Sequence, residues 1–156
     1  MSPHIVGSIL IGADDLVAQL VASRIPHMAG ASWGPCVALG VVRNGVLLGG
    51  FVYNNYRGHD VQLNAAFDRP GWALPQTLRA LFNYPFNQMG VARVTAVTGK
   101  SNHKARKGLL DLGFSQEGAH RRGLDGIETA ISYGMLREQC RWIKPHETRI
   151  NAAAAA

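Results

Sequence analysis

The segment from residue 94 to residue 114 constrains the fold of this chain more than any other. It begins with a short apolar run rich in β-branched side chains, residues 94–97, which is typical of a buried strand. Ser101 or Asn102 then offers a side-chain oxygen to cap the free N–H groups of a helix start. Gly113 stands where a left-handed residue is expected to end that helix. The segment therefore predicts a strand, a capped helix and a glycine stop before another strand.

Three cations lie beside the predicted helix start: Lys104, Arg106 and Lys107. The exposed N–H groups and the dipole at a helix N-terminus already favour an anion. The pattern therefore indicates a site for a phosphate-bearing ligand. It is equally typical of a basic, solvated helix face, and the spacing alone does not decide between the two.

The capped helix belongs to a pair of longer motifs. The first is Ser101-Asn102-x-x-Ala105…Leu109…Leu112-Gly113-Phe114-x-x-Glu117-Gly118…Arg121, and the second is Tyr133-Gly-Met-Leu-Arg137-Glu-x-Cys-Arg141-Trp142. In this order, the two motifs resemble the acetyl-CoA-dependent N-acetyltransferases of the GNAT superfamily. The branch that they resemble most includes the ribosomal-protein N-terminal acetyltransferases. The resemblance extends over about residues 38–142.

The resemblance implies one GNAT-like domain over residues 1–150. Its expected fold is α+β, an α/β three-layer arrangement in which a mixed, mostly antiparallel sheet of about six to seven strands has helices on both faces. Strand-like apolar runs agree with this: residues 5–11, 36–43, 46–56, 59–67, 94–97, 114–122 and 129–136. Asn44-Gly45 is a strong hairpin signal between two of these runs. Residues 151–156 end in five alanines, which indicates an added tail outside the domain.

The resemblance implies acetyl-CoA as the cofactor, held where two strands separate. In the family, the strand equivalent to residues 61–66 parts from the strand at residues 94–97, and backbone groups exposed there pair with the pantetheine arm. On this basis we expect Leu63, Asn64 and Ala65 to border the thioester.

The family also has a pyrophosphate loop, usually Gln/Arg-x-x-Gly-x-Gly/Ala, ahead of the next helix. Asp68 stands in its first position here, and Arg69 follows. The second half of the loop is matched by Gly71, Trp72 and Ala73. Backbone N–H groups at a helix start hold pyrophosphate without the signature side chain, and we expect Arg69 to reach it. The other expected cofactor-binding residues lie at the capped helix: Asn102, Lys104 and Arg106.

Acetyl transfer to an amine needs a base, donors for the developing oxyanion and an acid for the departing thiolate. Any backbone N–H on the separated strand serves as the oxyanion donor. The family commonly places a Tyr that serves as the general acid where this chain has Leu109. Either another group protonates the thiolate here, or no acid is needed, since a thiolate of ordinary pKa near ~8.5 also departs unaided. The candidate catalytic residues are Tyr133 and Ser101 as acids and Glu117 as a base or an orienting group. Ser115, His59 and Asp60 are alternatives.

The acceptor pocket of the resembled fold borders residues 27–35. We therefore expect His27, Met28 and Trp33 to line that pocket. The alternative for Trp33 is a purely structural position, with its indole packed over the core.

The leading interpretation is an acetyl-CoA-dependent N-acetyltransferase that acts on an amine of a protein, at an N-terminus or a lysine, or of a small molecule. The alternative is a non-catalytic module of the same fold that binds a protein or a nucleic acid through its basic surface. A net charge of +6 attracts acidic partners of either kind. The chain has no basic cluster interleaved with aromatic residues, which disfavours nucleic acid. A homodimer is left open.

The chain carries no sign of a membrane or metal partner. No apolar run approaches the ~18–20 residues that cross a bilayer, and the N-terminus lacks the features of a signal peptide. Cys36 and Cys140 are far apart and form neither a metal-ligand pattern nor a disulfide framework. We therefore expect a cytoplasmic protein without a metal site.

Overall fold

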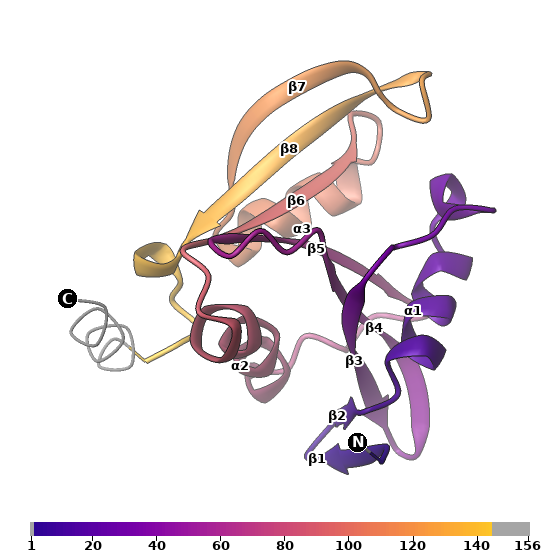
Figure 1. Ribbon diagram of the computed structural model, residues 1–156, viewed down its shortest axis with the longest axis vertical. Coiled ribbons are helices and arrows are strands. Elements are labelled where there is room, and N and C mark those ends of the chain that lie inside the picture. Colours follow the sequence, from indigo (N-terminus) through magenta and orange to yellow (C-terminus); the bar gives the residue numbers. More distant parts are fainter. Residues whose placement is uncertain (1, 145–156) are drawn as a thin grey trace.

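The Asn44-Gly45 turn joins two long strands, as its hairpin signal predicts. Both residues have positive φ angles, 53° and 75°, the geometry that a tight hairpin turn requires. The computed structural model describes residues 2–144 and places this hairpin in one sheet, in the order β1-β2-β3-β4-β5-β6-β8-β7 (Figure 1). The strands are β1 (His4–Val6), β2 (Ile9–Ile11), β3 (Cys36–Arg43), β4 (Val46–Asn54), β5 (Asp60–Phe67), β6 (Arg93–Gly99), β7 (Ser115–Leu124) and β8 (Glu128–Leu136).

The sheet is mixed and mostly antiparallel, as predicted, but it has eight strands instead of six to seven. Among the described strands, only the β5–β6 pair is parallel. The additional strand arises because residues 5–11, expected to form one strand, form a hairpin. Gly7, with φ 62°, reverses the chain there, and His4 pairs with Ile11.

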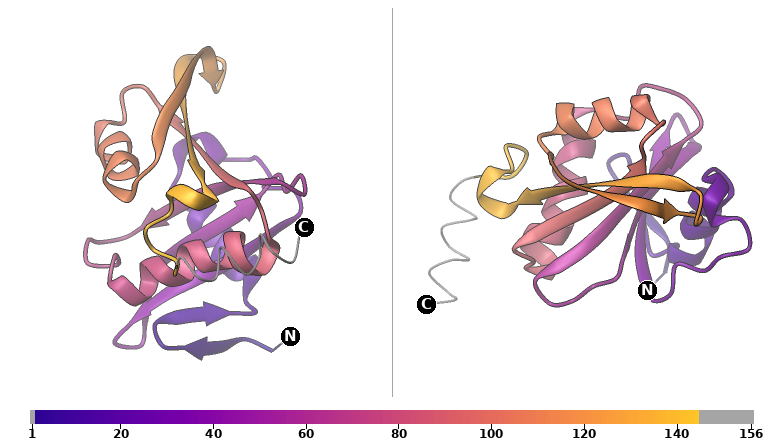
Figure 2. Two further views of the ribbon diagram at one scale, coloured as in Figure 1. Left: turned by 90° about the vertical axis from the view of Figure 1, so that its left-hand side faces the viewer. Right: turned by 90° about the horizontal axis from the view of Figure 1, so that it is seen from above.

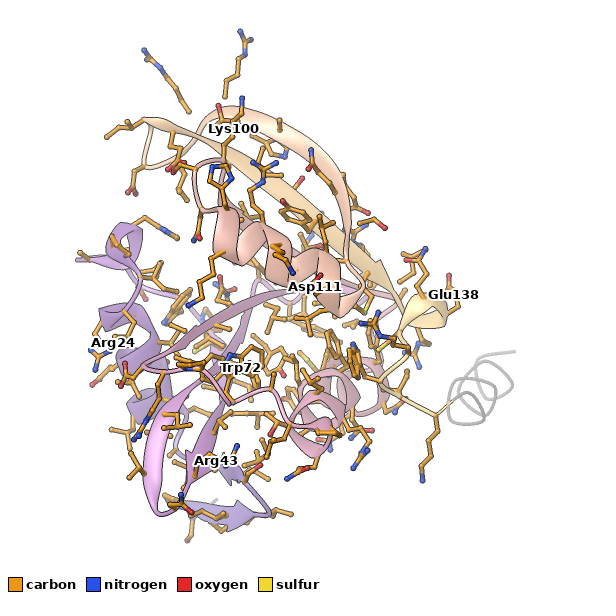
Figure 3. The ribbon with its side chains drawn as sticks, turned by 180° about the vertical axis from the view of Figure 1, so that it is seen from behind. Arg24, Arg43, Trp72, Lys100, Asp111 and Glu138 are labelled. Carbon is orange, nitrogen blue, oxygen red and sulfur yellow. The ribbon has the colours of Figure 1, made fainter. Side chains whose placement is uncertain are left out.

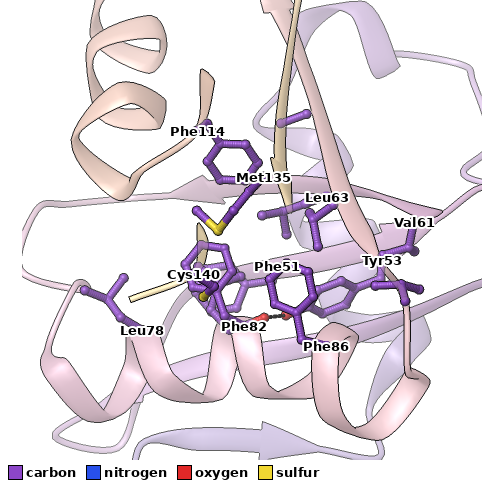
Figure 4. Packing of buried hydrophobic residues seen from close by; sticks show 14 of the residues in the cluster. Phe51, Tyr53, Val61, Leu63, Leu78, Phe82, Phe86, Phe114, Met135 and Cys140 are labelled. Carbon is purple, nitrogen blue, oxygen red and sulfur yellow. Dashed lines mark hydrogen bonds between the residues drawn. The ribbon is translucent and has the colours of Figure 1, made fainter. Parts of the chain in front are cut away.

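Successive side chains of the central strands point to opposite faces of the sheet. Both sets are apolar, so both faces of the sheet are apolar. On β4, Phe51 and Tyr53 enter one buried cluster, while Val52 between them enters another. All three are at most 1% exposed. Figure 4 shows the first cluster, in which the strand residues meet Phe82 and Phe86.

Helices cover both apolar faces and give the expected three layers (Figure 2). The helices are α1 (Asp14–Ser23), α2 (Pro75–Asn83) and α3 (His103–Leu112). Val17 and Val21 of α1 pack on the face that carries Val52. The opposite face packs against α2 through Leu81 and against α3 through Leu109.

Helix α3 begins and ends where the sequence predicts, and of the two cap candidates the structure selects Asn102. Asn102 is the N-cap, and its side-chain oxygen accepts a hydrogen bond from the backbone N–H of Ala105 at 3.1 Å. Gly113 ends the helix with φ 110° in the left-handed region. After α2, the α-helical pattern gives way at Pro85, which lacks an N–H, to a π-helical turn over Tyr84–Met89.

A tryptophan fixes the chain after β8. Trp142 donates a hydrogen bond through Nε1 to the carbonyl oxygen of Leu112, at 2.9 Å. The guanidinium of Arg141 lies 4.5 Å from the centroid of the same indole. Residues 145–156, including the alanine run, lie outside the described residues. Within residues 2–144, no helix is long and apolar enough to span a membrane.

Candidate functional site

Strands β5 and β6 pair over three positions and then separate. The pairs are Asp60–Arg93, Val61–Val94 and Gln62–Thr95. Beyond them, β5 remains paired with β4 as far as Phe67, and β6 remains paired with β8 as far as Gly99. The facing edges therefore open into a wedge, bounded by residues 63–67 of β5 and 96–99 of β6, near the middle of the sheet (Figure 1).

The residues expected to border a thioester lie on the β5 edge of this wedge. Leu63 is buried in the core, whereas Ala65 is exposed although its strand is central in the sheet. Ala65 pairs with Phe51 of β4, so both side chains lie on the face that α2 and α3 cover. Alternate residues of such a strand turn their N–H and C=O groups away from β4. These groups face the wedge and suit an extended, hydrogen-bonding ligand.

The loop between β5 and α2, residues 68–74, forms a wall beside the wedge. Trp72 stacks on Phe67 with 4.3 Å between ring centroids and meets Phe51 edge-on at 5.7 Å. Gly71 has φ 93°, and its carbonyl oxygen accepts a hydrogen bond from Arg43 Nη1 at 2.6 Å. Ala73 is exposed just ahead of α2. The loop is therefore held on one side by aromatic stacking and on the other by an arginine (Figure 3).

The carboxylate of Asp68 would repel a phosphate held by this loop, but it is already paired. Arg24, which caps the C-terminus of α1, places Nε 2.5 Å from Asp68 Oδ1 and Nη2 3.4 Å from Oδ2. This side-chain hydrogen bond lowers the pKa of Asp68 and raises the pKa of Arg24. The pair reduces the local repulsion, and the adjacent Arg69, which is exposed, also attracts the Asp68 carboxylate.

The start of α3 contributes a second set of N–H groups and cations. Lys104 is exposed and can turn toward a ligand. Arg106 is directed inward: its Nε donates to Tyr133 Oη at 3.1 Å and its Nη1 to the carbonyl oxygen of Lys100 at 2.8 Å. The structure therefore engages Arg106 in contacts that hold α3 on the sheet, and its role in binding a ligand stays a prediction.

Each of the three candidate catalytic side chains has another partner. Tyr133 is fully buried, and its hydroxyl accepts the bond from Arg106. Ser101 donates through its backbone N–H, at 2.7 Å, and through its hydroxyl to the carboxylate of Glu128. Glu117 lies 2.5 Å from Arg93 Nη2 in an ion pair. The three residues are not brought together, and their catalytic roles stay predictions.

Polar side chains lie beneath the wedge on the face that carries α1. Asn64 Nδ2 donates to Asn54 Oδ1 at 2.9 Å, and Asn54 donates to the carbonyl oxygen of Trp33 at 3.2 Å. Trp33 itself donates to the carbonyl oxygen of Ala18 at 2.9 Å and packs against the buried cluster that contains Val17 and Val21 of α1. Trp33 therefore occupies the structural position that was the alternative to a binding role. His27 and Met28 lie half-buried in the neighbouring turn.

Several residues of this region carry no sequence signal. Arg24, Arg43 and Arg93 find their partners 44, 28 and 24 positions away in the chain. Glu128 likewise meets Ser101 across 27 positions, and this contact lowers the pKa of its carboxyl group. Such pairs depend on how separate elements pack, and a local pattern does not contain that information.

The assembled geometry suits one kind of ligand. An open strand edge offers backbone hydrogen bonds, while the starts of α2 and α3 offer N–H groups for negative charge. A long molecule with an amide-rich arm and a phosphate end fits both features. Within residues 2–144, no group of three or more His, Cys, Asp or Glu side chains is arranged to hold a metal ion.

Comparisons with known proteins agree with the expected fold. No protein-family model and no curated protein matches the chain in sequence. Among solved structures, a GNAT-family acetyltransferase from Bacillus anthracis has a TM-score of 0.61 at 16% identity, covering 88% of this chain and 99% of its own. A ribosomal-protein-S5-alanine acetyltransferase from Vibrio fischeri has a TM-score of 0.62 at 16% identity, covering 92% of this chain and 100% of its own.

A third similar structure is described as a probable acetyltransferase. It has a TM-score of 0.59 at 22% identity over 67% of this chain, which spans 63% of the length of that protein. At such identities the comparisons establish the fold alone. The chain has the fold of GNAT acetyltransferases, and the site has to carry the argument for activity.

Proposed function

We propose that this protein transfers an acetyl group from acetyl-CoA to an amine. The observation that carries the proposal is the wedge: β5 and β6 part after Gln62 and Thr95, beside the starts of two helices. A parallel pair that opens in the middle of a sheet exposes backbone groups at a cost, since unpaired backbone polar groups are unfavourable when buried. A ligand that pairs with them accounts for the geometry.

Two parts of the site suit different parts of acetyl-CoA. The pantetheine arm fits the β5 edge at Leu63, Asn64 and Ala65. The pyrophosphate fits the loop and helix starts, where the expected contacts come from Arg69, Gly71, Trp72, Ala73, Asn102, Lys104 and Arg106. The Arg24–Asp68 pair supports this assignment because it neutralises the acidic side chain of the loop. Trp72, fixed by Phe67, serves as a wall beside the arm.

The chemistry that we propose relies mainly on the backbone. Acetyl-CoA supplies a carbonyl activated by a thiolate leaving group. A backbone N–H on the β5 edge donates to the carbonyl oxygen as it gains negative charge. We propose that the thiolate departs without a side-chain acid, because Tyr133 and Ser101 are engaged with Arg106 and Glu128. Glu117 orients Arg93, and the proton of the amine passes to solvent.

For the acceptor we propose a protein N-terminus, a lysine or a small amine, approaching from the face that carries α1. The polar groups there, Asn64 and Asn54, suit an amine better than they suit an apolar substrate. The solved structure named for ribosomal-protein S5 alanine supports the N-terminal option as one to test first.

Two free cysteines, Cys36 and Cys140, suit a reducing cytoplasm.

One observation favours the alternative, a non-catalytic binding module of the same fold. The three leading catalytic candidates, Tyr133, Ser101 and Glu117, each have another partner, so a chain that binds CoA without turnover is consistent with these contacts. The experiment that separates the two incubates the protein with acetyl-CoA and a panel of amines, N-terminal peptides and cell lysate. Mass spectrometry then measures acetylated products. Turnover supports the enzyme, whereas tight acetyl-CoA binding with no product in any arm supports the module.

A further inference from the structure

A cavity lies between the loop that precedes α2 and the β3–β4 hairpin. It has a volume of about 290 Å³. The hairpin contributes Arg43 and Asn44, and the loop contributes Arg69 and Gly71. Nothing in the proposed acetyl transfer requires a cavity at this position.

The cavity is built for negative charge. Two of its lining residues are arginines, and none of the described residues that line it is acidic. The nearest carboxylate in sequence, Asp68, makes its hydrogen bond with Arg24, and its attraction to Arg69 is the smaller contribution to its lowered pKa. Arg43 is fixed by a hydrogen bond to the carbonyl oxygen of Gly71. This bond uses one N–H of the guanidinium, and the other N–H groups can bind a ligand. Two arginines in this arrangement suit a phosphate, which each of them can meet with paired N–H groups.

We propose that Arg43 and Arg69 bind the 3′-phosphate of coenzyme A. This inference rests on the proposed function, because the loop shared by the cavity is the one expected to hold the pyrophosphate. The pyrophosphate is matched to the backbone N–H groups of the loop, so the 3′-phosphate is the remaining phosphate of the cofactor, and we place Arg69 between the two phosphate groups. A phosphate monoester carries nearly two negative charges at neutral pH, and two guanidinium groups match that charge.

The experiment compares CoA with dephospho-CoA, which differs only by the 3′-phosphate, in calorimetric titrations at low salt. We expect the wild-type protein to bind CoA about 10- to 100-fold more tightly, the range of one to two charge-assisted hydrogen bonds. Arg43→Gln should reduce this ratio toward one by weakening CoA alone. Arg69→Gln should weaken both ligands, because Arg69 is also expected to contact the pyrophosphate, but it should weaken CoA more and so reduce the ratio as well. Arg57→Gln is the matched control, since Arg57 lies in the β4–β5 connection at the opposite end of the strands. That variant should keep the wild-type ratio.

The ratio of affinities separates the inference from a purely structural role of Arg43. A disturbed loop weakens both ligands equally and leaves the ratio unchanged, which would overturn the inference. Equal binding of CoA and dephospho-CoA by the wild type would also overturn it, while the proposed function would stand. Binding of neither ligand would overturn both. Inorganic phosphate that competes with CoA but not with dephospho-CoA would support the site, whereas phosphate that competes with both equally would contradict it.

Discussion

Arg24 and Asp68 form a two-bond contact across 44 positions of the chain, with Nε 2.5 Å from Oδ1. Arg24 belongs to the end of α1, on one face of the sheet, and Asp68 begins the loop that leads to α2 on the other. The contact connects the two layers at the edge of the proposed phosphate site. It also explains how an acidic residue is tolerated where a phosphate is expected.

Breaking this pair should weaken binding of acetyl-CoA. Arg24→Gln leaves the Asp68 carboxylate unpaired beside the phosphates, and the affinity for acetyl-CoA in calorimetry should fall. Adding Asp68→Asn removes the repelling charge and should restore the affinity. If the double variant binds as weakly as Arg24→Gln alone, the carboxylate is not the cause.

The same pair predicts a dependence of stability on pH. Because Arg24 lowers the pKa of Asp68, the pair stabilises the fold at pH values above the ordinary carboxyl pKa, and this contribution is lost as the pH falls through the lowered pKa. The difference in unfolding free energy between wild type and Arg24→Gln should therefore shrink in strong acid. Urea unfolding at neutral and acidic pH measures it. A difference that grows on acidification would contradict the assigned pairing.

Asn102→Ala removes the cap of α3. The free energy of unfolding should fall by about 0.5–2 kcal/mol, and the affinity for acetyl-CoA should fall with it because the helix start becomes less ordered. Asn102→Ser is the matched control, since serine also caps helices, and it should preserve both properties. Unchanged affinity in the alanine variant would place the phosphates elsewhere.

Gly108→Ala should stabilise the protein. A Cβ built at Gly108 meets no protein atom within 4 Å, so close approach of a strand does not explain this glycine, and alanine favours a helix by about 1 kcal/mol. Denaturant unfolding measures the gain. If acetyl-CoA binding falls at the same time, the glycine serves close approach of the ligand; destabilisation would contradict the geometry of α3.

Tyr133→Phe distinguishes an acid from a structural hydroxyl. Loss of the bond from Arg106 should cost about 1 kcal/mol of stability, while kcat should change by no more than a few-fold. If Tyr133 protonates the thiolate, kcat should fall by ~10²–10⁴-fold, the usual contribution of a general acid. Steady-state kinetics across pH decide, because loss of an acid also alters the alkaline limb of the profile.

The sequence predicted the elements whose signals are local. The Asn102 cap, the Gly113 stop and the Asn44-Gly45 hairpin each depend on a few adjacent residues, and all three are confirmed. The mixed sheet followed from the resemblance, and the separation of β5 and β6 lies where that resemblance placed it.

Other features depend on contacts between distant segments. Nothing near Asp68 in the sequence indicates Arg24 as its partner, and nothing near Ser101 indicates Glu128. The β1–β2 hairpin was missed because Gly7 alone is a weak turn signal within an apolar run. Side-chain engagement, which decides whether Tyr133 or Glu117 is free to react, becomes visible only when the elements are packed.

The wedge between β5 and β6 is the central claim, and filling it tests that claim most directly. Ala65 is exposed on the β5 edge, so Ala65→Trp should obstruct the wedge without disturbing the core, while Ala119→Trp places the same side chain on the exposed strand β7. We predict that wild type and Ala119→Trp bind acetyl-CoA in calorimetric titrations and that Ala65→Trp does not. Absence of binding by the wild type, or undiminished binding by a folded Ala65→Trp variant, would contradict the account.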